Sequence, residues 1–370
     1  MAHLTLVFAK AATANFVVAG IPAAARAALA VERAAQFAPR PFRCSIAVAG
    51  GWTPSSWCLK ELERLAPTLE IDFCDSTLIE RETDRVFVCG EDLPDERAVL
   101  AALRNHCPGR PRDCHLRYLD EPTAIAKLKR AGNAIIAATG KASDGIVSRY
   151  LNRPISRAIS RLLLLIPAVT PFYATLGTGA LGIAMAACLF FGGQTGLIAG
   201  ALLYQSASIF DGVDGEIARA TYRTSESGAI MDSLIDAATN LAFIAGLTFN
   251  LWLQGFQAAG TAGLLGFLML AAGLALVGRM ARKSGGSFNF DAIKSRVGQD
   301  KSLVMRWLTY LTMRDFYAAA ATFLVLLGLG PEALVIFCVV TAGWLAVVFL
   351  VCLRESRWLR ASRNPQADRA

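Results

Sequence analysis

The sequence predicts a cytoplasmic three-layer α/β domain followed by an all-α transmembrane domain of six helices. Only 18% of the 370 residues are charged, against about 25% in soluble domains. The mean hydropathy is positive, at +0.44, which excludes a disordered chain and argues against a purely soluble enzyme. The apolar excess lies in residues 171–353, whereas residues 1–143 have the composition of a soluble domain.

The first 143 residues carry the pattern of a largely parallel sheet. Short β-like runs are expected at 4–8, 44–48, 69–74 and 85–89. Helices are expected between them, at 23–37, 56–65 and 95–105. Strands that alternate with helices favour an α/β sandwich. A charged and polar stretch, 113–143, closes this domain.

Residues 144–167 predict an amphipathic helix ahead of the first membrane span. Arginines recur there at every fourth residue and therefore lie along one side of a helix: Arg149, Arg153, Arg157 and Arg161. A basic amphipathic helix next to a span is typical of a helix on an anionic membrane surface. The alternative is a solvated helix that packs on the N-terminal domain.

Six apolar segments come near the ~20 residues needed to cross a bilayer: 171–191, 195–218, 228–252, 261–281, 315–330 and 332–353. The segments on one side of these spans hold 20 Lys and Arg, and the connections on the other side hold none. The positive-inside rule then places both termini and the soluble domain in the cytoplasm, and the expected membrane is the inner (plasma) membrane of the cell. The net charge of +8 belongs to the cytoplasmic face, so no nucleic acid is expected as a partner. The membrane domain is predicted at 168–354, with a basic tail at 355–370.

Four aspartates interrupt the second and third spans at one end: Asp211, Asp214, Asp232 and Asp236. Spacings of three and four residues put each pair on one helical face, and a short turn makes the two helices antiparallel neighbours. Four converging carboxylates need a counter-charge, and their oxygens favour Mg²⁺, Mn²⁺ or Ca²⁺. The alternative function is a carboxylate-based cation or proton transporter, which the location at one end of the spans disfavours.

This segment resembles the signature of the CDP-alcohol phosphotransferases. The family pattern D-x2-D-G-x2-A-R-x8-G-x3-D-x3-D matches at every fixed position from Asp211 to Asp236, and the resemblance covers about residues 145–353. It implies a six-span, usually dimeric enzyme of the EC 2.7.8 type. Such an enzyme moves a phosphoalcohol group from a CDP-alcohol to an acceptor hydroxyl and releases CMP. The intact pattern disfavours a catalytically silent scaffold.

The resemblance also implies roles for the acids and substrates for the enzyme. Asp211, Asp214 and Asp232 would hold one or two Mg²⁺ or Mn²⁺ ions, and Asp236 would contribute at the metal or act as the catalytic base. The donor would be a lipid or polyol derivative such as CDP-diacylglycerol or CDP-inositol. The acceptor would be anionic or a polyol, and the pathway phospholipid or inositol-phospholipid synthesis.

Residues between and beside the acids are expected to contact the CDP moiety: Gly215, Ala218, Arg219 and Ser225. Gly228 would let the second and third spans pack closely. One position departs from the family, since Phe172 stands where a Pro-Asn pair commonly supplies an asparagine.

Basic residues near the membrane are candidates for binding an anionic acceptor: Arg279, Arg282, Lys283 and Arg314. The alternative for each is topology signalling and contact with lipid headgroups. Arg314 with Asp315 has the further alternative of an interfacial ion pair.

The N-terminal domain resembles sugar-phosphate nucleotidyltransferases in the segment 18–22 and the helix that follows. Bifunctional inositol-phosphate cytidylyltransferase/di-myo-inositol phosphate phosphate synthases share this layout. Their glycine-rich G-x-G-T-R-L loop is absent, because residues 8–16 read FAKAATANF. Without a nest of backbone amides, triphosphate binding is hard to sustain. A degenerate, non-catalytic domain is therefore expected, which would serve dimerisation, regulation or substrate delivery.

Cysteine usage gives no sign of a disulfide framework or a zinc motif. The nine cysteines form no CxxC pair, which favours a reducing compartment. Four residues within a short stretch have ligand chemistry that suits zinc: His106, Cys107, Cys114 and His115. Adjacent Cys-His pairs rarely point the same way, so an ordinary surface loop is expected there.

Overall fold

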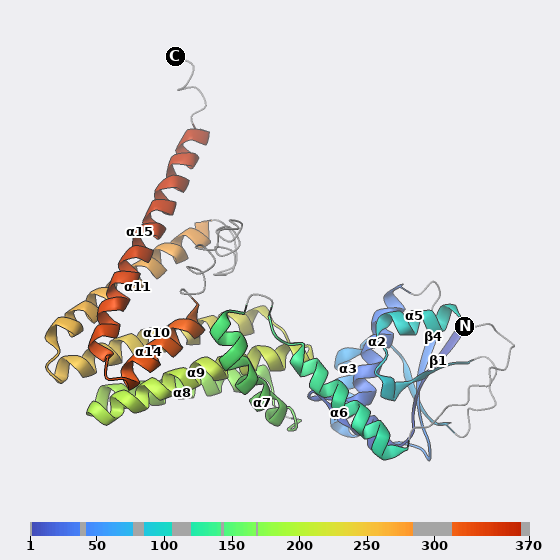
Figure 1. Cartoon of the computed structure of the whole chain (residues 1–370). Helices are drawn as coiled ribbons and strands as arrows, with labels where there is room; N and C mark the ends of the chain where they lie inside the picture. Colours follow the sequence, from blue (N-terminus) through green and yellow to red (C-terminus); the bar gives the residue numbers. More distant parts are fainter. Residues whose placement is uncertain are drawn as a thin grey trace. The chain divides into compact units, whose positions relative to one another are not determined.

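The computed structural model describes residues 2–37, 42–76, 85–105, 120–141, 144–167, 169–283 and 313–363. The chain divides into two compact units (Figure 1). The first unit comprises Met1–Gly140, Arg157–Thr170 and Glu216–Arg223, and the second unit comprises Lys141–Ser156, Pro171–Gly215 and Thr224–Ala370. The segment of residues 106–119 and its Cys-His pairs lie outside the described residues.

The first unit contains a four-stranded parallel sheet in the order β5-β4-β1-β6, which confirms the predicted parallel α/β region. The strands are β1 (Ala2–Phe8), β4 (Phe42–Val48), β5 (Ile71–Asp75) and β6 (Arg85–Cys89). The chain first adds strands on one side of β1 and then crosses to its other side with β6. A change of direction of this kind marks the sheet edge where α/β proteins bind ligands.

Three predicted helices are confirmed beside this sheet: α2 (Ala23–Phe37), α3 (Ser56–Leu65) and α5 (Glu96–Arg104). Each of the two shorter helices begins at a side-chain cap. Ser55 Oγ accepts from the Cys58 amide at 3.2 Å, and Asp95 Oδ1 accepts from the Ala98 amide at 2.7 Å. Helix α2 is rich in alanine, and 11 of its 15 residues are buried in the core formed with the strands.

The stretch of residues 113–143 contains a helix that its polar composition conceals. Helix α6 spans Glu121–Ala137, with a proline in its first turn and Glu121 at its start. Both residues suit a helix N-terminus. The structure also adds short elements after β1 and β6: α1 (Ala11–Asn15), the hairpin strands β2 (Val17–Val18) and β3 (Ile21–Pro22), and η1 (Gly90–Asp92).

The second unit is helical, and five of its described helices are long and apolar enough to cross a membrane. The chain is therefore a multi-pass membrane protein. These five helices are α8 (Pro171–Phe191), α9 (Gly193–Thr221), α10 (Glu226–Leu253), α11 (Gln257–Lys283) and α15 (Gly330–Arg363). A sixth helix, α14 (Arg314–Leu326), lies between α11 and α15 in the sequence. At 1.5 Å per residue, the 13 residues of α14 span about 20 Å. The hydrocarbon core of a bilayer is about 30 Å thick, so the structure does not confirm α14 as the predicted fifth membrane span.

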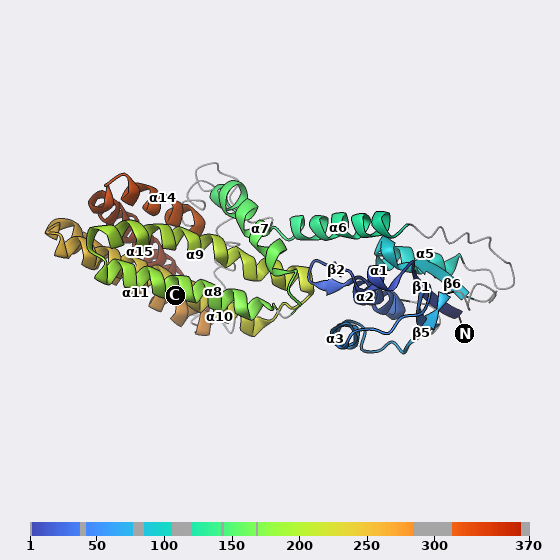
Figure 2. The same ribbon diagram turned by 90° about the horizontal axis from the view of Figure 1, so that it is seen from below.

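Helices α8, α9 and α10 lie side by side (Figure 2). They pack closely where a glycine faces a large side chain. A Cβ at Gly177 of α8 would lie 2.6 Å from the ring of Phe210 on α9. A Cβ at Gly246 of α10 would lie 2.7 Å from Leu189 of α8. Small residues allow such approaches between membrane helices, where packing rather than the hydrophobic effect drives association.

The predicted amphipathic helix forms as one π-helical turn, η2 (Ser148–Asn152), that continues into α7 (Arg153–Leu163). Small polar side chains are buried and large apolar ones are exposed, among them Leu151, Ile155 and Leu162. An apolar face turned outward supports the membrane-surface interpretation. Arg153 departs from the expected basic face, because it is buried and pairs with Asp144 at 2.9 Å.

Candidate metal and nucleotide site

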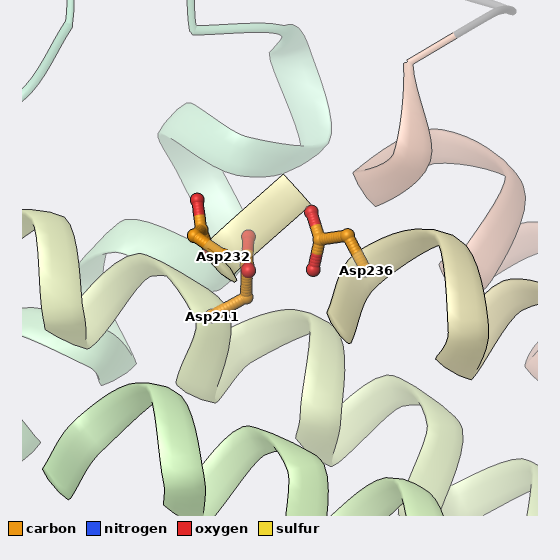
Figure 3. A group of neighbouring side chains, drawn as sticks. All are labelled: Asp211, Asp232 and Asp236. Atoms are coloured by element: carbon orange, nitrogen blue, oxygen red, sulfur yellow. The ribbon is translucent and has the colours of Figure 1, made fainter. Parts of the chain in front are cut away.

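Three of the four signature aspartates lie together between α9 and α10. The carboxylates of Asp211, Asp232 and Asp236 point toward one another (Figure 3). One oxygen of each lies within 4.8 Å of the other two. Helix α9 is continuous through Asp211, and α10 begins only five residues after α9 ends, so the two acidic ends meet as the spacing predicts.

The fourth acid, Asp214, is held by a residue that sequence reasoning missed. Thr175 Oγ1 of α8 donates to Asp214 Oδ2 at 2.7 Å, and both side chains are buried. Asp232 interacts with Asp214 as well as with Asp211, which joins all four acids. Phe172, in the place of the family's asparagine, is 55% exposed. The polar contribution of α8 to the acids therefore comes one turn later, from Thr175.

Arg314 at the start of α14 supplies a positive charge to the acids. Its Nη1 lies 3.0 Å from Asp211 Oδ1 and also pairs with Asp236 Oδ1. One guanidinium therefore balances one of the four carboxylate charges. Asp315 accepts instead from Asn152 and Ser208, both at 3.2 Å, so Arg314 and Asp315 do not form the simple pair that the sequence left open.

Uncharged polar groups surround Arg314 and Asp315 in the second unit. Gln205 Nε2 donates to Asn152 Oδ1 at 2.9 Å. Tyr204 donates to Asn240 at 2.8 Å, and Asn240 donates to Tyr317 at 2.9 Å. None of these residues was predicted, because single Asn, Gln and Tyr side chains in apolar helices form no recognisable sequence pattern.

The donor set fits a divalent metal ion. Asp211 Oδ1 is buried, and its charged neighbour Arg314 Nη1 lies 3.0 Å away without hydrogen-bond geometry. All the converging atoms are carboxylate oxygens, the ligands that Mg²⁺ and Mn²⁺ prefer. Because Arg314 balances a single charge, the cluster retains negative charge for a metal.

The residues expected to contact CDP follow along α9 and the turn after it. Asp211, Asp214, Gly215 and Ala218 share one face of this continuous helix. Arg219 Nε donates to the carbonyl of Thr139 at 2.7 Å. Ser225 caps α10 by accepting from the Gly228 amide at 3.1 Å.

Gly228 does not serve the close helix packing that was expected of it. A Cβ at this position would meet Ser225 Oγ at 2.9 Å, and no atom of α9 lies among its neighbours within 4 Å. The residue is exposed in the first turn of α10. Its missing side chain therefore leaves room at the serine cap rather than between spans.

The structure describes the expected acceptor-binding residues only in part. Arg279 on α11 is exposed. Arg282 and Lys283 lie in the last turn of α11, and their side chains are outside the described residues, as is the whole of 284–312. Arg314 is thus the one member of this set that the structure places beside the acids.

In the first unit, the edge of the sheet between β1 and β6 is filled by a carboxylate of the chain itself. Glu91 Oε1 accepts from the Ala9 amide at 2.8 Å and from Thr13 Oγ1 at 2.7 Å. Glu91 is only 2% exposed. A buried carboxylate on the amide that follows β1 would repel a phosphate there.

Comparison with known proteins agrees with the signature. The model of the CDP-alcohol phosphatidyltransferase family matches residues 168–352, half of the chain. Curated relatives include a protein described as "Bifunctional IPC transferase and DIPP synthase" from Thermococcus kodakarensis, which is 40% identical over 124 residues. Proteins with the same description from Archaeoglobus fulgidus and Aquifex aeolicus are 39% and 35% identical over 119 and 133 residues.

These alignments cover only part of each protein. They take in 33%, 32% and 36% of this chain, and 27%, 23% and 29% of the three relatives. The shared sequence is thus less than a third of the length of each relative, whereas the family model alone spans half of this chain. On that match, with the complete signature on two adjacent helices, the chain belongs to the CDP-alcohol phosphatidyltransferase family.

Proposed function

We propose that this protein transfers a phosphoalcohol group from a CDP-alcohol to an acceptor hydroxyl and releases CMP. The observation that carries the proposal is the convergence of Asp211, Asp232 and Asp236 within the family signature. The comparisons give no support to the transporter alternative. A transporter would also place its acids along the length of the spans rather than together at one end of α9 and α10.

Asp211, Asp214 and Asp232 would hold one or two Mg²⁺ or Mn²⁺ ions, and Asp236 would complete the site. When bound, the metal neutralises the donor diphosphate and stabilises the departing CMP. Thr175 orients Asp214 through its 2.7 Å hydrogen bond. Gly215, Ala218, Arg219 and Ser225 would contact the CDP moiety.

Asp236 would act as the general base. The acceptor hydroxyl loses its proton to the Asp236 carboxylate as the acceptor oxygen bonds to the β-phosphorus. The bond between that phosphorus and the bridging oxygen breaks, and the bridging oxygen leaves on CMP. Arg314 pairs with Asp236 and so holds its carboxylate beside the other acids.

The substrates and setting of the reaction belong to this proposal too. CDP-diacylglycerol and CDP-inositol are the donors to test, and an anionic or polyol acceptor suits Arg314 and the amide and hydroxyl groups around it. The enzyme would be a homodimer with six spans, the short α14 being the fifth. Its active site and both termini would face the cytoplasm at the plasma membrane.

The α/β domain would be a degenerate nucleotidyltransferase without catalysis of its own. The carboxylate of Glu91 on the Ala9 amide supports this view. The names of the relatives describe a bifunctional protein, and the second activity is not proposed for this chain.

The test is CMP release by the purified full-length protein in detergent micelles, with Mg²⁺, each donor and a panel of acceptors. We expect CMP with at least one pair of substrates. Asp232→Asn should lower the rate on the order of a thousandfold, since a metal ligand supplies several kcal/mol of transition-state stabilisation. Asp72→Asn, at an exposed position of β5, is the matched control and should keep the full rate. Proteoliposome ion flux that Asp232→Asn abolishes, without CMP release by the wild type, would contradict the proposal.

A further inference from the structure

The end of α9, which carries the last part of the signature, belongs to the same compact unit as the α/β domain. This end, Glu216–Arg223, includes Ala218 and Arg219. The last carbonyls of a helix have no partner within the helix and need one from elsewhere. Two arginines of the α/β domain supply those partners.

Arg26 of α2 reaches the helix end from a buried position. Its Nη2 donates to the carbonyl of Ala220 at 2.8 Å and to those of Val18 and Ala19 at 3.0 and 3.2 Å. The side chain is only 6% exposed. A buried guanidinium with three carbonyl partners fixes the distance between the β2–β3 hairpin and the end of α9.

Arg64 of α3 binds the next two carbonyls. Its Nη2 donates to Thr221 at 2.9 Å and its Nη1 to Tyr222 at 3.3 Å. Glu61 of α3 pairs with Arg64 at 2.6 Å and also with Arg223. Cations at a helix C-terminus are additionally favoured by the helix dipole.

Tyr222 adopts a backbone conformation that side chains rarely take. Its φ is +54°, and the Arg223 amide bonds back to the Ala218 carbonyl at 2.9 Å, which is the helix-ending arrangement that usually requires glycine. The Tyr222 ring lies 5.4 Å from the guanidinium carbon of Arg26 and 5.0 Å from that of Arg33. Cation–π contact with two arginines explains why a tyrosine occupies this position.

The tip of the β2–β3 hairpin, Ala19 and Gly20, also packs against the end of α9. Ala19 and Gly20 both have positive φ, at +46° and +83°, as a tight hairpin turn requires. A Cβ at Gly20 would lie 2.5 Å from Leu164 and 3.0 Å from Thr221. The segment that resembles a nucleotidyltransferase therefore packs here against the end of a membrane helix.

We propose that the α/β domain is a clamp on the end of α9 and that Arg26 is a positioning residue for Ala218 and Arg219, an inference that rests on the proposed function. The clamp consists of Arg26, Glu61, Arg64 and the hairpin tip. It sets where α9 ends and hence where the nucleotide-contacting part of the signature is presented. The domain thus contributes to donor binding without touching the donor.

Two measurements on the full-length protein in detergent test the clamp. Hydrogen exchange followed by mass spectrometry reports on the backbone of residues 216–223, and equilibrium binding of CMP with Mg²⁺ reports on the donor site. In Arg26→Ala we expect exchange in this segment to rise at least tenfold and CMP affinity to fall roughly tenfold. Arg26→Lys keeps the charge without the fork and should restore part of both.

Arg97→Ala is the matched control, because Arg97 is an exposed arginine on α5 of the same domain. It should change neither measurement. If residues 216–223 of Arg26→Ala exchange as slowly as those of the wild type, the clamp is wrong. If they exchange faster but the affinity for CMP is unchanged, Arg26 is not a positioning residue for the donor site. A wild type that binds no CMP would overturn the proposed function, and the exchange data would still decide whether the clamp exists.

Discussion

Glu91 in the first unit and Asp211 in the second unit differ in how completely the chain itself satisfies their carboxylate oxygens. In the first unit, Glu91 Oε1 accepts hydrogen bonds from both the Ala9 amide and the Thr13 hydroxyl. In the second unit, Asp211 Oδ1 is buried and faces Arg314 Nη1 at 3.0 Å without hydrogen-bond geometry. Burying a carboxylate oxygen that accepts no hydrogen bond is costly, so the two carboxylates differ in whether a bound ligand could still stabilise them.

The difference distinguishes a candidate ligand site from a sheet edge whose polar groups are already paired within the chain. At the sheet edge between β1 and β6, a ligand would have to displace the hydrogen bonds that Glu91 already accepts from Ala9 and Thr13. Where several carboxylates share the single guanidinium of Arg314, they retain net negative charge, and a cation would balance it. Ligand binding is therefore expected at the acids of α9 and α10 and not at the end of β1.

Of the changes proposed here, removal of divalent metal ions should have the largest effect on activity. Excess EDTA should reduce CMP release to background, and Mg²⁺ or Mn²⁺ should restore it. The same ions should raise the melting temperature of the wild type, because a ligand that binds only the folded state stabilises it. Asp211→Asn should lose most of this thermal shift. Full activity in EDTA would show that the acids serve another purpose.

A smaller effect is expected from Thr175, which donates to Asp214 at 2.7 Å. Thr175→Ala removes a hydrogen bond to a charged group, which is worth about 1.5–3 kcal/mol. The Mg²⁺ concentration for half-maximal activity should therefore rise by about tenfold or more. Thr175→Ser retains the hydroxyl and should stay close to the wild type. Equal Mg²⁺ dependence for the alanine and serine variants would remove Thr175 from the site.

A smaller effect again is expected from a substitution at Glu91, which tests whether the sheet edge of the first unit is closed to ligands. Glu91→Ala leaves the Ala9 amide without its partner, at a cost of about 1–3 kcal/mol. Faster hydrogen exchange in β1 and α1 should follow, with CMP release unchanged. Neither the wild type nor the variant should bind CTP in isothermal titration calorimetry. Binding of CTP by the wild type would show that the domain still accepts a triphosphate.

Sequence patterns predicted elements whose signal repeats along the chain. Short β-like and helix-like runs predicted α2, α3 and β6 with the bounds that the structure has. Helix α6 was not predicted, because its segment was interpreted only as a charged and polar stretch. The long apolar segments were recognisable from composition alone, but the 13 residues of α14 show that apolar length does not decide how far a helix runs.

The acids were predictable because a spacing of three or four residues fixes a helical face. Their partners were not, since Thr175 and Arg314 meet the acids only through the packing of α8 and α14. The same holds for Arg26, which is 194 residues from Ala220 in sequence. A single buried side chain with a distant backbone partner leaves no periodic trace.

The smallest expected effect concerns two thiols in the core of the α/β domain. Burial raises the pKa of both Cys44 and Cys58 to about 12, with added repulsion from Asp72 and Glu61 respectively. A raised pKa keeps the unreactive thiol form until the pH approaches that value, so at pH 8 only about one thiol in ten thousand is ionised. N-ethylmaleimide should therefore leave both unlabelled in the native protein and label both in denaturant, as read by peptide mass spectrometry. Native labelling of Cys44 at the denatured rate would show that the core beside β1 opens readily and would weaken the contrast between the two units.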